Sequence, residues 1–219
     1  MSTSSNYSPQ RALMIRDQLM ARGIRDPRVL DVLAELPRER FIDPDLEAVA
    51  YADRALPIDC GQTISQPYIV ALMTEALRLT GNERALEIGT GSAYQAAVLS
   101  RLAREVVSIE RHEKLFRQAT RVLNDLGVTN VRLVLGDGSH GLAAGAPYDR
   151  IIVTAAADTM PEELFEQLTA GGILVIPVGD RDSQILRRIE KIDGRPRITD
   201  LTACRFVPLV GASTCDTNQ

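Results

Sequence analysis

Lysine and histidine are scarce in this chain of 219 residues. The only lysines are Lys114 and Lys191, and neither lies in a G-K-[ST] loop, which excludes a P-loop nucleotidase. The two histidines, His112 and His140, have no partner at the spacing of metal ligands, so we expect no metal site. We interpret His112 as a surface or capping residue at the start of a helix.

Cysteine is also rare, and there is no run of 18 apolar residues. Three scattered cysteines are too few for a disulfide framework or a zinc site, which favours a reducing, cytoplasmic setting. No base lies near Cys60 in the sequence, so we expect a small packed residue there, and we expect Cys215 to be an exposed thiol in the tail. We expect no segment to span a bilayer, and the polar start MSTSSNYSPQ is not typical of a secretory signal.

The charge balance bears on the partners. The chain has 25 basic and 29 acidic residues, a formal net charge of −4. Nucleic-acid binding needs a positive footprint and a polybasic membrane anchor needs clustered basic residues, so we expect neither partner. The arginines between residues 181 and 197 are interpreted as the solvated face of edge strands. We expect a monomer.

Helices and loops are predicted over residues 1–80. The apolar spacing and the prolines predict helices over Gln10–Arg22, from about Asp26 to before Pro37, and over Pro67–Leu79. The stretch FIDPDLEAVAYADRALPIDCGQTISQ between the last two has no regular pattern. Loops of this length in compact domains are usually functional or disordered, and its apolar residues favour a functional loop. Closure of residues 40–66 as a lid is one hypothesis for it.

Strands and helices alternate over residues 81–210. Continuous apolar runs are typical of buried parallel strands, so the pattern predicts an α/β fold with a doubly wound, mostly parallel Rossmann-like sheet and an N-terminal helical extension. We divide one compact domain into a helical and loop region (1–80), a core (81–210) and a flexible tail (211–219). The expected strands are Ala85–Ile88, Val106–Ile109, Val131–Leu135, Arg150–Thr154, Ile173–Val178 and an antiparallel edge pair, Gln184–Ile192 and Arg197–Val207; the expected helices are Tyr94–Ala103, His112–Leu126 and Pro161–Leu168.

Three strand ends carry residues suited to an adenosine group. Gly89 and Gly91 follow the first strand, where glycines let the backbone approach a ligand. Glu110 ends the second strand about 20 residues later, the spacing at which an acidic residue binds ribose hydroxyls. Asp137 follows the third strand, where it could meet a base amino group. Because ligands of such sheets bind at the carboxyl ends of the strands, these residues predict an adenosine site.

The glycine turn favours S-adenosylmethionine over a dinucleotide. A dinucleotide fingerprint, G-x-G-x-x-G/A, needs a small sixth residue, and Tyr94 stands there. A large side chain hinders the close helix approach that a pyrophosphate requires, whereas S-adenosylmethionine has no phosphate. A nicotinamide oxidoreductase is therefore the least favoured of the classes considered.

The polar loop CGQTISQPYIVA leads into the third helix at Pro67. Ser65 and Gln66 lie where a side chain can cap a helix, which is one interpretation of Ser65. The other is an anion site, because free N–H groups at a helix start attract carboxylates and a hydroxyl there could orient one.

With these motifs, most of residues 11–210 resembles the protein-L-isoaspartate O-methyltransferases, within the class I S-adenosylmethionine-dependent fold. Two positions depart from the family pattern: Ala93 replaces a usual glycine, which a helix start should tolerate, and Asp59-Cys60 stands where a glycine is common. The most specific match is GQTISQPY. The resembling stretches are RGIRDPRVLDVLAELPRERF, ALPIDCGQTISQPYIVALMTEAL, ALEIGTGSAYQAAVL, PYDRIIVTAAA, LTAGGILVIPVG and RFVPLV.

The resemblance implies methyl transfer from S-adenosylmethionine to the α-carboxylate of isoaspartyl residues in damaged proteins and peptides, starting repair through a succinimide. It implies that Ser65 is the active-site serine. The implied cofactor-binding residues are Thr63 and Ile64 beside the methionine and the substrate, Gly89, Thr90, Gly91 and Ser92 in the glycine turn, Glu110 and Arg111 at the ribose, and Asp137 and Gly138 at the adenine. A carboxylate is already ionised at neutral pH, so no general base is needed.

Two alternatives remain open beside this interpretation. One is a methyltransferase that acts on a small carboxylic acid, which the GQTISQPY loop disfavours. The other is a non-catalytic adenosine-binding module, which has no need of Ser65.

Overall fold

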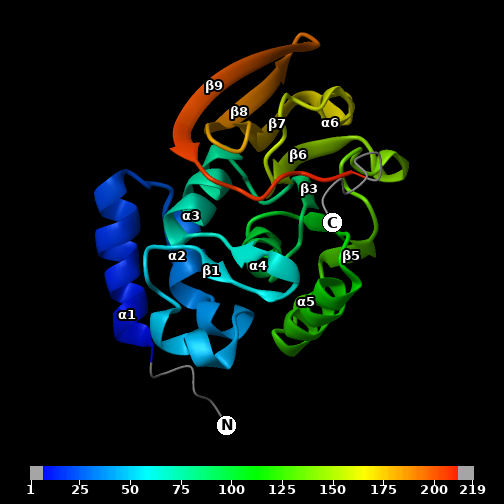
Figure 1. The fold of residues 1–219 in the computed structure, drawn as a ribbon. Helices are drawn as coiled ribbons and strands as arrows, with labels where there is room; N and C mark the ends of the chain where they lie inside the picture. The colour runs from blue at the N-terminus through cyan, green and yellow to red at the C-terminus, as the bar shows by residue number, and fades with distance from the viewer. Residues whose placement is uncertain (1–6, 212–219) are drawn as a thin grey trace.

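The computed structural model describes residues 7–211. A seven-stranded sheet lies between helices, in the order β5-β4-β3-β6-β7-β8-β9 (Figure 1). The pairs from β5 to β7 are parallel and the last two are antiparallel. The strands are β3 (Arg84–Ile88), β4 (Glu105–Glu110), β5 (Val131–Leu135), β6 (Tyr148–Val153), β7 (Leu168–Gly179), β8 (Gln184–Ile192) and β9 (Arg195–Cys204).

This arrangement confirms the predicted doubly wound sheet with its N-terminal helical extension. The chain leaves β3 for β4 on one side and later returns to β6 on the other, so the switch point lies between β3 and β6. Ligands of open α/β sheets bind at the carboxyl ends of the strands beside such a point. The helices of the core are α4 (Tyr94–Ser100), α5 (Glu113–Asp125) and α6 (Glu162–Glu166).

Asp26, Pro27 and Gly23 mark helix ends as predicted, but the first helix begins at Ser8 and not at Gln10, and the third ends at Ala76 and not at Leu79. Asp26 caps α2, its side chain accepting the Arg28 N–H, and Pro27 occupies the first helical position. Gly23, with φ +99°, ends the first helical segment in the left-handed region. The segments are α1 (Ser8–Leu13), which continues as a π-helix (Met14–Leu19) and a 3₁₀ turn (Met20–Arg22), then α2 (Pro27–Glu35) and α3 (Pro67–Ala76).

The stretch between α2 and α3 has more structure than its sequence pattern predicts. It forms 3₁₀ turns and a short antiparallel hairpin in which Leu56 pairs with Ile64. The hairpin ends at Ile64, which is buried, and Ser65 and Gln66 connect it to α3. The turns are Arg38–Phe41, Pro44–Val49, Asp59–Gly61 and, later in the chain, Ala143–Gly145; the hairpin strands are β1 (Leu56–Pro57) and β2 (Thr63–Ile64).

Two predicted strand limits are wrong by three residues or more, and the other strand limits differ by two residues at most. β7 begins at Leu168 and includes the glycines expected to precede it, because its pairing with β6 shifts register between Tyr148 and Arg150. β9 ends at Cys204 and not at Val207. Phe206 is held by the Gln184 side chain, whose amide exchanges two hydrogen bonds with the Phe206 main chain (2.6 and 3.2 Å). The chain therefore leaves the sheet after Cys204 and crosses in front of β3 and β6 (Figure 1).

The buried core packs the N-terminal helices, α3 and α4 together with side chains of the sheet in one cluster, and a second cluster contains Leu86, Val107 and Phe165. α5 lies within the predicted helix His112–Leu126 and buries Leu115, Ala119 and Leu123. The division at residues 80 and 210 stays a prediction, and Cys215 with most of the predicted tail lies outside the described residues.

Candidate active site

A cavity of about 350 Å³ lies at the carboxyl ends of β3, β4, β5 and β6, within the size range of small-molecule sites. Every residue that the sequence analysis assigned to the site lines it, although the sequence separates the first from the last by more than 70 positions. They are Thr63, Ile64, Ser65, Gly89, Thr90, Gly91, Ser92, Glu110, Arg111, Asp137 and Gly138.

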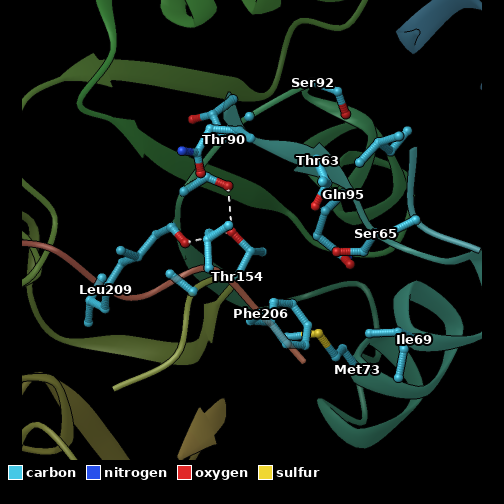
Figure 2. A pocket seen from close by; sticks show the side chains of 18 of the residues that line it. Thr63, Ser65, Ile69, Met73, Thr90, Ser92, Gln95, Thr154, Phe206 and Leu209 are labelled. Atoms are coloured by element: carbon cyan, nitrogen blue, oxygen red, sulfur yellow. Dashed lines mark hydrogen bonds between the residues drawn. The ribbon is translucent and has the colours of Figure 1, made fainter. Parts of the chain in front are cut away.

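The turn after β3 can only be built with glycine at its first position. Gly89 has φ +93°, and a Cβ there would collide with the Thr154 hydroxyl. That hydroxyl donates to the carbonyls of Ile88 (3.0 Å) and Gly89 (2.7 Å), as the dashed lines in Figure 2 show. Thr154 follows β6 and was missed by the sequence analysis, although its place beyond a strand end adjacent to β3 was a usable signal.

Glu110 joins this turn to the start of α5. It is 4% exposed, and its two carboxylate oxygens accept N–H groups of Gly91 and His112, both at 2.8 Å. The carboxylate therefore shapes the glycine turn, and each oxygen keeps a further lone pair for a ligand hydroxyl. His112 is the residue before α5, as expected, and it also lines the cavity.

The far end of the predicted adenosine site combines an exposed acid with a tight backbone. Asp137 is exposed and one of its oxygens accepts the Ser139 N–H at 2.8 Å. Gly138 is buried, and a Cβ there would lie 2.9 Å from Ile88. Arg111 is exposed and donates to the carbonyl of Val210 at 3.0 Å, so it ties the segment that follows β9 to this end of the cavity.

Ser65 does not cap α3. Gln66 is the residue before the helix, and it makes no side-chain capping bond. Among residues 7–211, no group hydrogen-bonds with the Ser65 hydroxyl, while the Ser65 carbonyl accepts a hydrogen bond from Arg38 at 2.7 Å. Figure 2 shows Ser65 and Gln95 at the same part of the cavity, from the loop before α3 and from α4. The hydroxyl is therefore available to a bound molecule.

The segment after β9 covers part of the cavity and was not expected to. Main-chain hydrogen bonds join Ala156 to Val207 (2.8 Å) and to Leu209 (2.7 Å). Phe206 forms an apolar wall with Met73 and Ile69 (Figure 2). The stretch RFVPLV did not predict this path, because its apolar pattern also fits the end of a strand.

Cys60 is exposed, so the expectation of a packed residue is wrong. It lies in the turn before β2, in the left-handed region with φ +58°. Asp59 beside it is bound by Lys114 (2.6 Å) and Gln118 (2.7 Å), which lowers the pKa of the carboxyl mainly through the Lys114 hydrogen bond. These contacts fasten the turn before Ser65 to α5.

A family model described as protein-L-isoaspartate(D-aspartate) O-methyltransferase matches residues 10–214. The chain belongs to this family.

Relatives within the family match nearly the whole chain. A protein-L-isoaspartate O-methyltransferase 2 from Pelobacter propionicus is 52% identical over 94% of this chain and 93% of its own length. A protein-L-isoaspartate O-methyltransferase from Anaeromyxobacter dehalogenans is 57% identical over 85% of this chain and 91% of its own length.

Solved structures agree with the fold. A protein-L-isoaspartate O-methyltransferase superposes with a TM-score of 0.80 and 33% identity, covering 92% of this chain and 66% of that longer chain. A Plasmodium falciparum structure described as a protein-L-isoaspartate O-methyltransferase in complex with S-adenosyl-L-homocysteine gives a TM-score of 0.79 at 24% identity, covering 92% of this chain and 98% of that chain.

Within residues 7–211, every helix is too short or too polar to cross a membrane. The same residues contain no group of three or more His, Cys, Asp or Glu that could hold a metal ion.

Proposed function

We propose that the cavity transfers a methyl group from S-adenosylmethionine to the free α-carboxylate of an L-isoaspartyl residue, with Ser65 orienting the acceptor. The chain is an S-adenosylmethionine-dependent protein-L-isoaspartate O-methyltransferase. The observation that carries the site assignment is the Ser65 hydroxyl, free of partners among the described residues, in the same cavity as the glycine turn and Glu110.

The cavity fits the donor. The positive φ angles of Gly89 and Gly91 leave room beside the backbone, and Glu110 has lone pairs for two neighbouring hydroxyls. S-adenosylmethionine contains no pyrophosphate, which agrees with the large buried Tyr94 at the start of α4. Bound there, the cofactor supplies a sulfonium-activated methyl group. Gly89–Ser92 would hold its methionine part, Glu110 and Arg111 its ribose, and Asp137–Gly138 its adenine.

This chain's residues need only place the acceptor. An α-carboxylate has a pKa of about 3.5 and is ionised at neutral pH, so no side chain has to remove a proton. Ser65 donates a hydrogen bond to one carboxylate oxygen and leaves the other in line with the methyl group, while Phe206, Met73 and Ile69 exclude water. Orientation of this kind can supply roughly 7–11 kcal/mol of barrier reduction. The new methyl ester then loses methanol as the following backbone nitrogen attacks it, which closes a succinimide.

The decisive assay supplies labelled S-adenosylmethionine with two peptides that differ only in an isoaspartyl or a normal aspartyl linkage. We expect base-labile label on the isoaspartyl peptide alone. Label on neither peptide would favour a small acid as acceptor or a non-catalytic module.

We predict that Ser65→Ala lowers kcat by about 10- to 100-fold, because a hydrogen bond to a charged group is worth roughly 1.5–3 kcal/mol. The Kd for S-adenosylhomocysteine, measured by calorimetry, should change less than twofold. The matched control is Ser100→Ala, whose hydroxyl donates to the Ala97 carbonyl within α4 (2.7 Å) and has no other partner among the described residues. Unchanged turnover in Ser65→Ala would remove the orienting role.

We also propose that the enzyme works as a monomer in the cytoplasm and binds no nucleic acid. The formal net charge of −4 supports the last point, and the exposed thiol of Cys60 agrees with a reducing compartment.

A further inference from the structure

Arg38 joins three segments behind the cavity, which its own side chain does not line although Ser65 and Tyr94 do. Its Nε donates to the Ala50 carbonyl (2.8 Å) and its Nη2 to the Ser65 carbonyl (2.7 Å). The guanidinium carbon lies 4.9 Å from the centre of the Tyr94 ring, which itself lines the cavity. The Arg38 side chain thus connects the main chain of Ser65 to Ala50, which follows the turn Pro44–Val49, and to Tyr94 at the start of α4.

The electrostatic setting of Arg38 is unusual. The side chain is 0% exposed, and its burial lowers the pKa of the guanidinium. Within the described part of the chain no carboxylate pairs with it; buried Nη1 makes no hydrogen bond of normal geometry, and the phenol of Tyr94 is the side chain that interacts with the guanidinium. Neighbouring Glu39 is engaged by Tyr51 and Arg11. Burial of an unpaired charge is costly, so a purely structural role would be served better by an apolar side chain.

We propose that Arg38 is a positioning residue for the methyl acceptor: it fixes the main chain of Ser65 and supplies a positive charge that attracts the substrate α-carboxylate from behind the cavity wall. The inference rests on the proposed function, since it takes Ser65 as the residue that meets that carboxylate.

The two contributions have different sources. A hydroxyl is aimed by the dihedral angles of its own residue, and the Arg38–Ser65 hydrogen bond restrains those angles. The positive charge acts at longer range, through a buried region in which charges are weakly screened. The restraint should act on kcat, and the charge should act on binding of an anionic acceptor but not of a neutral one.

The test uses the full-length enzyme with the substitutions Arg38→Met and Arg38→Lys. Acceptor binding is measured by calorimetry on enzyme saturated with S-adenosylhomocysteine, using an isoaspartyl peptide and the same peptide with a neutral α-carboxamide. We expect Arg38→Met to weaken binding of the carboxylate peptide about tenfold or more and to change binding of the carboxamide less than twofold. Arg38→Lys keeps the charge and should restore carboxylate binding to within about threefold, while kcat stays about tenfold low because one ammonium cannot hold both carbonyls.

The matched control is Arg150→Met. Arg150 is also largely buried and its Nε also donates to a main-chain carbonyl, that of Leu77 (2.5 Å), but it lies on β6 away from the cavity. It should lower the thermal midpoint without selective loss of carboxylate binding. If Arg38→Met does not fold, Arg38→Lys decides through its split between kcat and binding.

Three results overturn the inference while leaving the methyltransferase assignment intact: equal weakening of both peptides, a parallel loss of S-adenosylhomocysteine affinity, or normal kcat in Arg38→Lys. Failure of the unmodified enzyme to methylate the isoaspartyl peptide would instead refute the proposed function.

Discussion

Two residues other than glycine adopt left-handed backbone conformations beside the candidate active site. Cys60 has φ +58° and Ala93 has φ +69°. Both stand where the sequence departs from glycines usual in the family. The left-handed region costs an ordinary L-residue roughly 1–2 kcal/mol. At Ala93 two effects offset much of that cost. Burial of the methyl group contributes about 0.8 kcal/mol, and alanine loses less conformational freedom on folding than glycine would. The exposed Cys60 has no such burial to offset it.

We therefore predict that Cys60→Gly raises the free energy of unfolding by about 0.5–1 kcal/mol, the difference between relief of the left-handed strain and the greater freedom of glycine in the unfolded chain. In a chain of this size that corresponds to roughly 2 °C in Tm, measurable by differential scanning calorimetry. Cys60→Ser keeps the Cβ and should give no gain. Equal midpoints for the two variants would show that the turn is not strained.

At the scale of elements, a buried acid, Glu190, forms ion pairs that stabilise the edge hairpin β8–β9. The many arginines of this part of the sequence give no indication of it. Glu190 is 4% exposed and pairs with Arg78 after α3 (2.7 Å), with Arg188 (3.3 Å) and with Arg197 on β9. The hydrogen bond from Arg197 is the largest of the effects that lower the pKa of this carboxyl. The arginines expected to form only a solvated face therefore include members of a cluster that joins three segments.

Removing that charge should be costly. We predict that Glu190→Gln lowers the free energy of unfolding by roughly 1–3 kcal/mol, because it leaves the mostly buried Arg188 without an anion. Arg78 and Arg197 are more than half exposed and can be hydrated, which keeps the loss below that of a fully buried pair.

Urea denaturation measures this loss. Asp200→Asn removes the exposed partner of Arg187 in the same hairpin and should cost less than about 0.5 kcal/mol. Similar losses in the two variants would contradict a special role for Glu190.

For the molecule as a whole, the sequence predicted what periodicity and strand-end chemistry encode. α5 has a strong helical stripe, β3 to β6 are apolar runs, and the glycines and acids at their ends meet at one edge because parallel strands all end there. The loop before α3 suggested Ser65 as either a cap or an anion site, and the family resemblance favoured the second.

What the sequence did not predict depends on single long-range contacts. The hairpin that pairs Leu56 with Ile64 has strands of two residues, which are too short to show an alternating apolar pattern. The segment after β9 leaves the sheet because Gln184 holds Phe206 from 22 positions away, and Arg38 reaches Ser65 across 27. Apolar pattern carries no information on such pairs.

In the interior of the sheet, β3 carries a fully buried acid, Glu87, between β4 and β6. Its Oε2 accepts the Ser108 hydroxyl at 2.5 Å, and that hydroxyl meets Thr90 of the glycine turn at 2.6 Å. The other oxygen, Oε1, is buried with no hydrogen-bond partner within residues 7–211. Burial, assisted by the charge of Glu110, raises the pKa of Glu87 to about 8, although the Ser108 hydrogen bond lowers it.

This pKa makes global stability depend on pH in a direction opposite to that of most carboxylates. Below about pH 4.5 Glu87 is protonated in both the folded and the unfolded chain, and its stabilising contribution is complete. As pH rises toward 8, Glu87 ionises first in the unfolded chain, so the free energy of unfolding falls by roughly 1.4 kcal/mol per pH unit, and above about pH 8 the loss is constant.

Glu87→Gln cannot ionise, so its urea midpoint relative to the parent should rise steadily between pH 5 and 8. The pKa of the Glu190 carboxyl is lowered from its ordinary value, so the urea midpoint of Glu190→Gln should differ from that of the parent by a nearly constant amount between pH 5 and 8. Parallel profiles for Glu87→Gln and the parent would mean that Glu87 is ionised in the folded protein, with a charge in the interior of the sheet beneath the glycine turn.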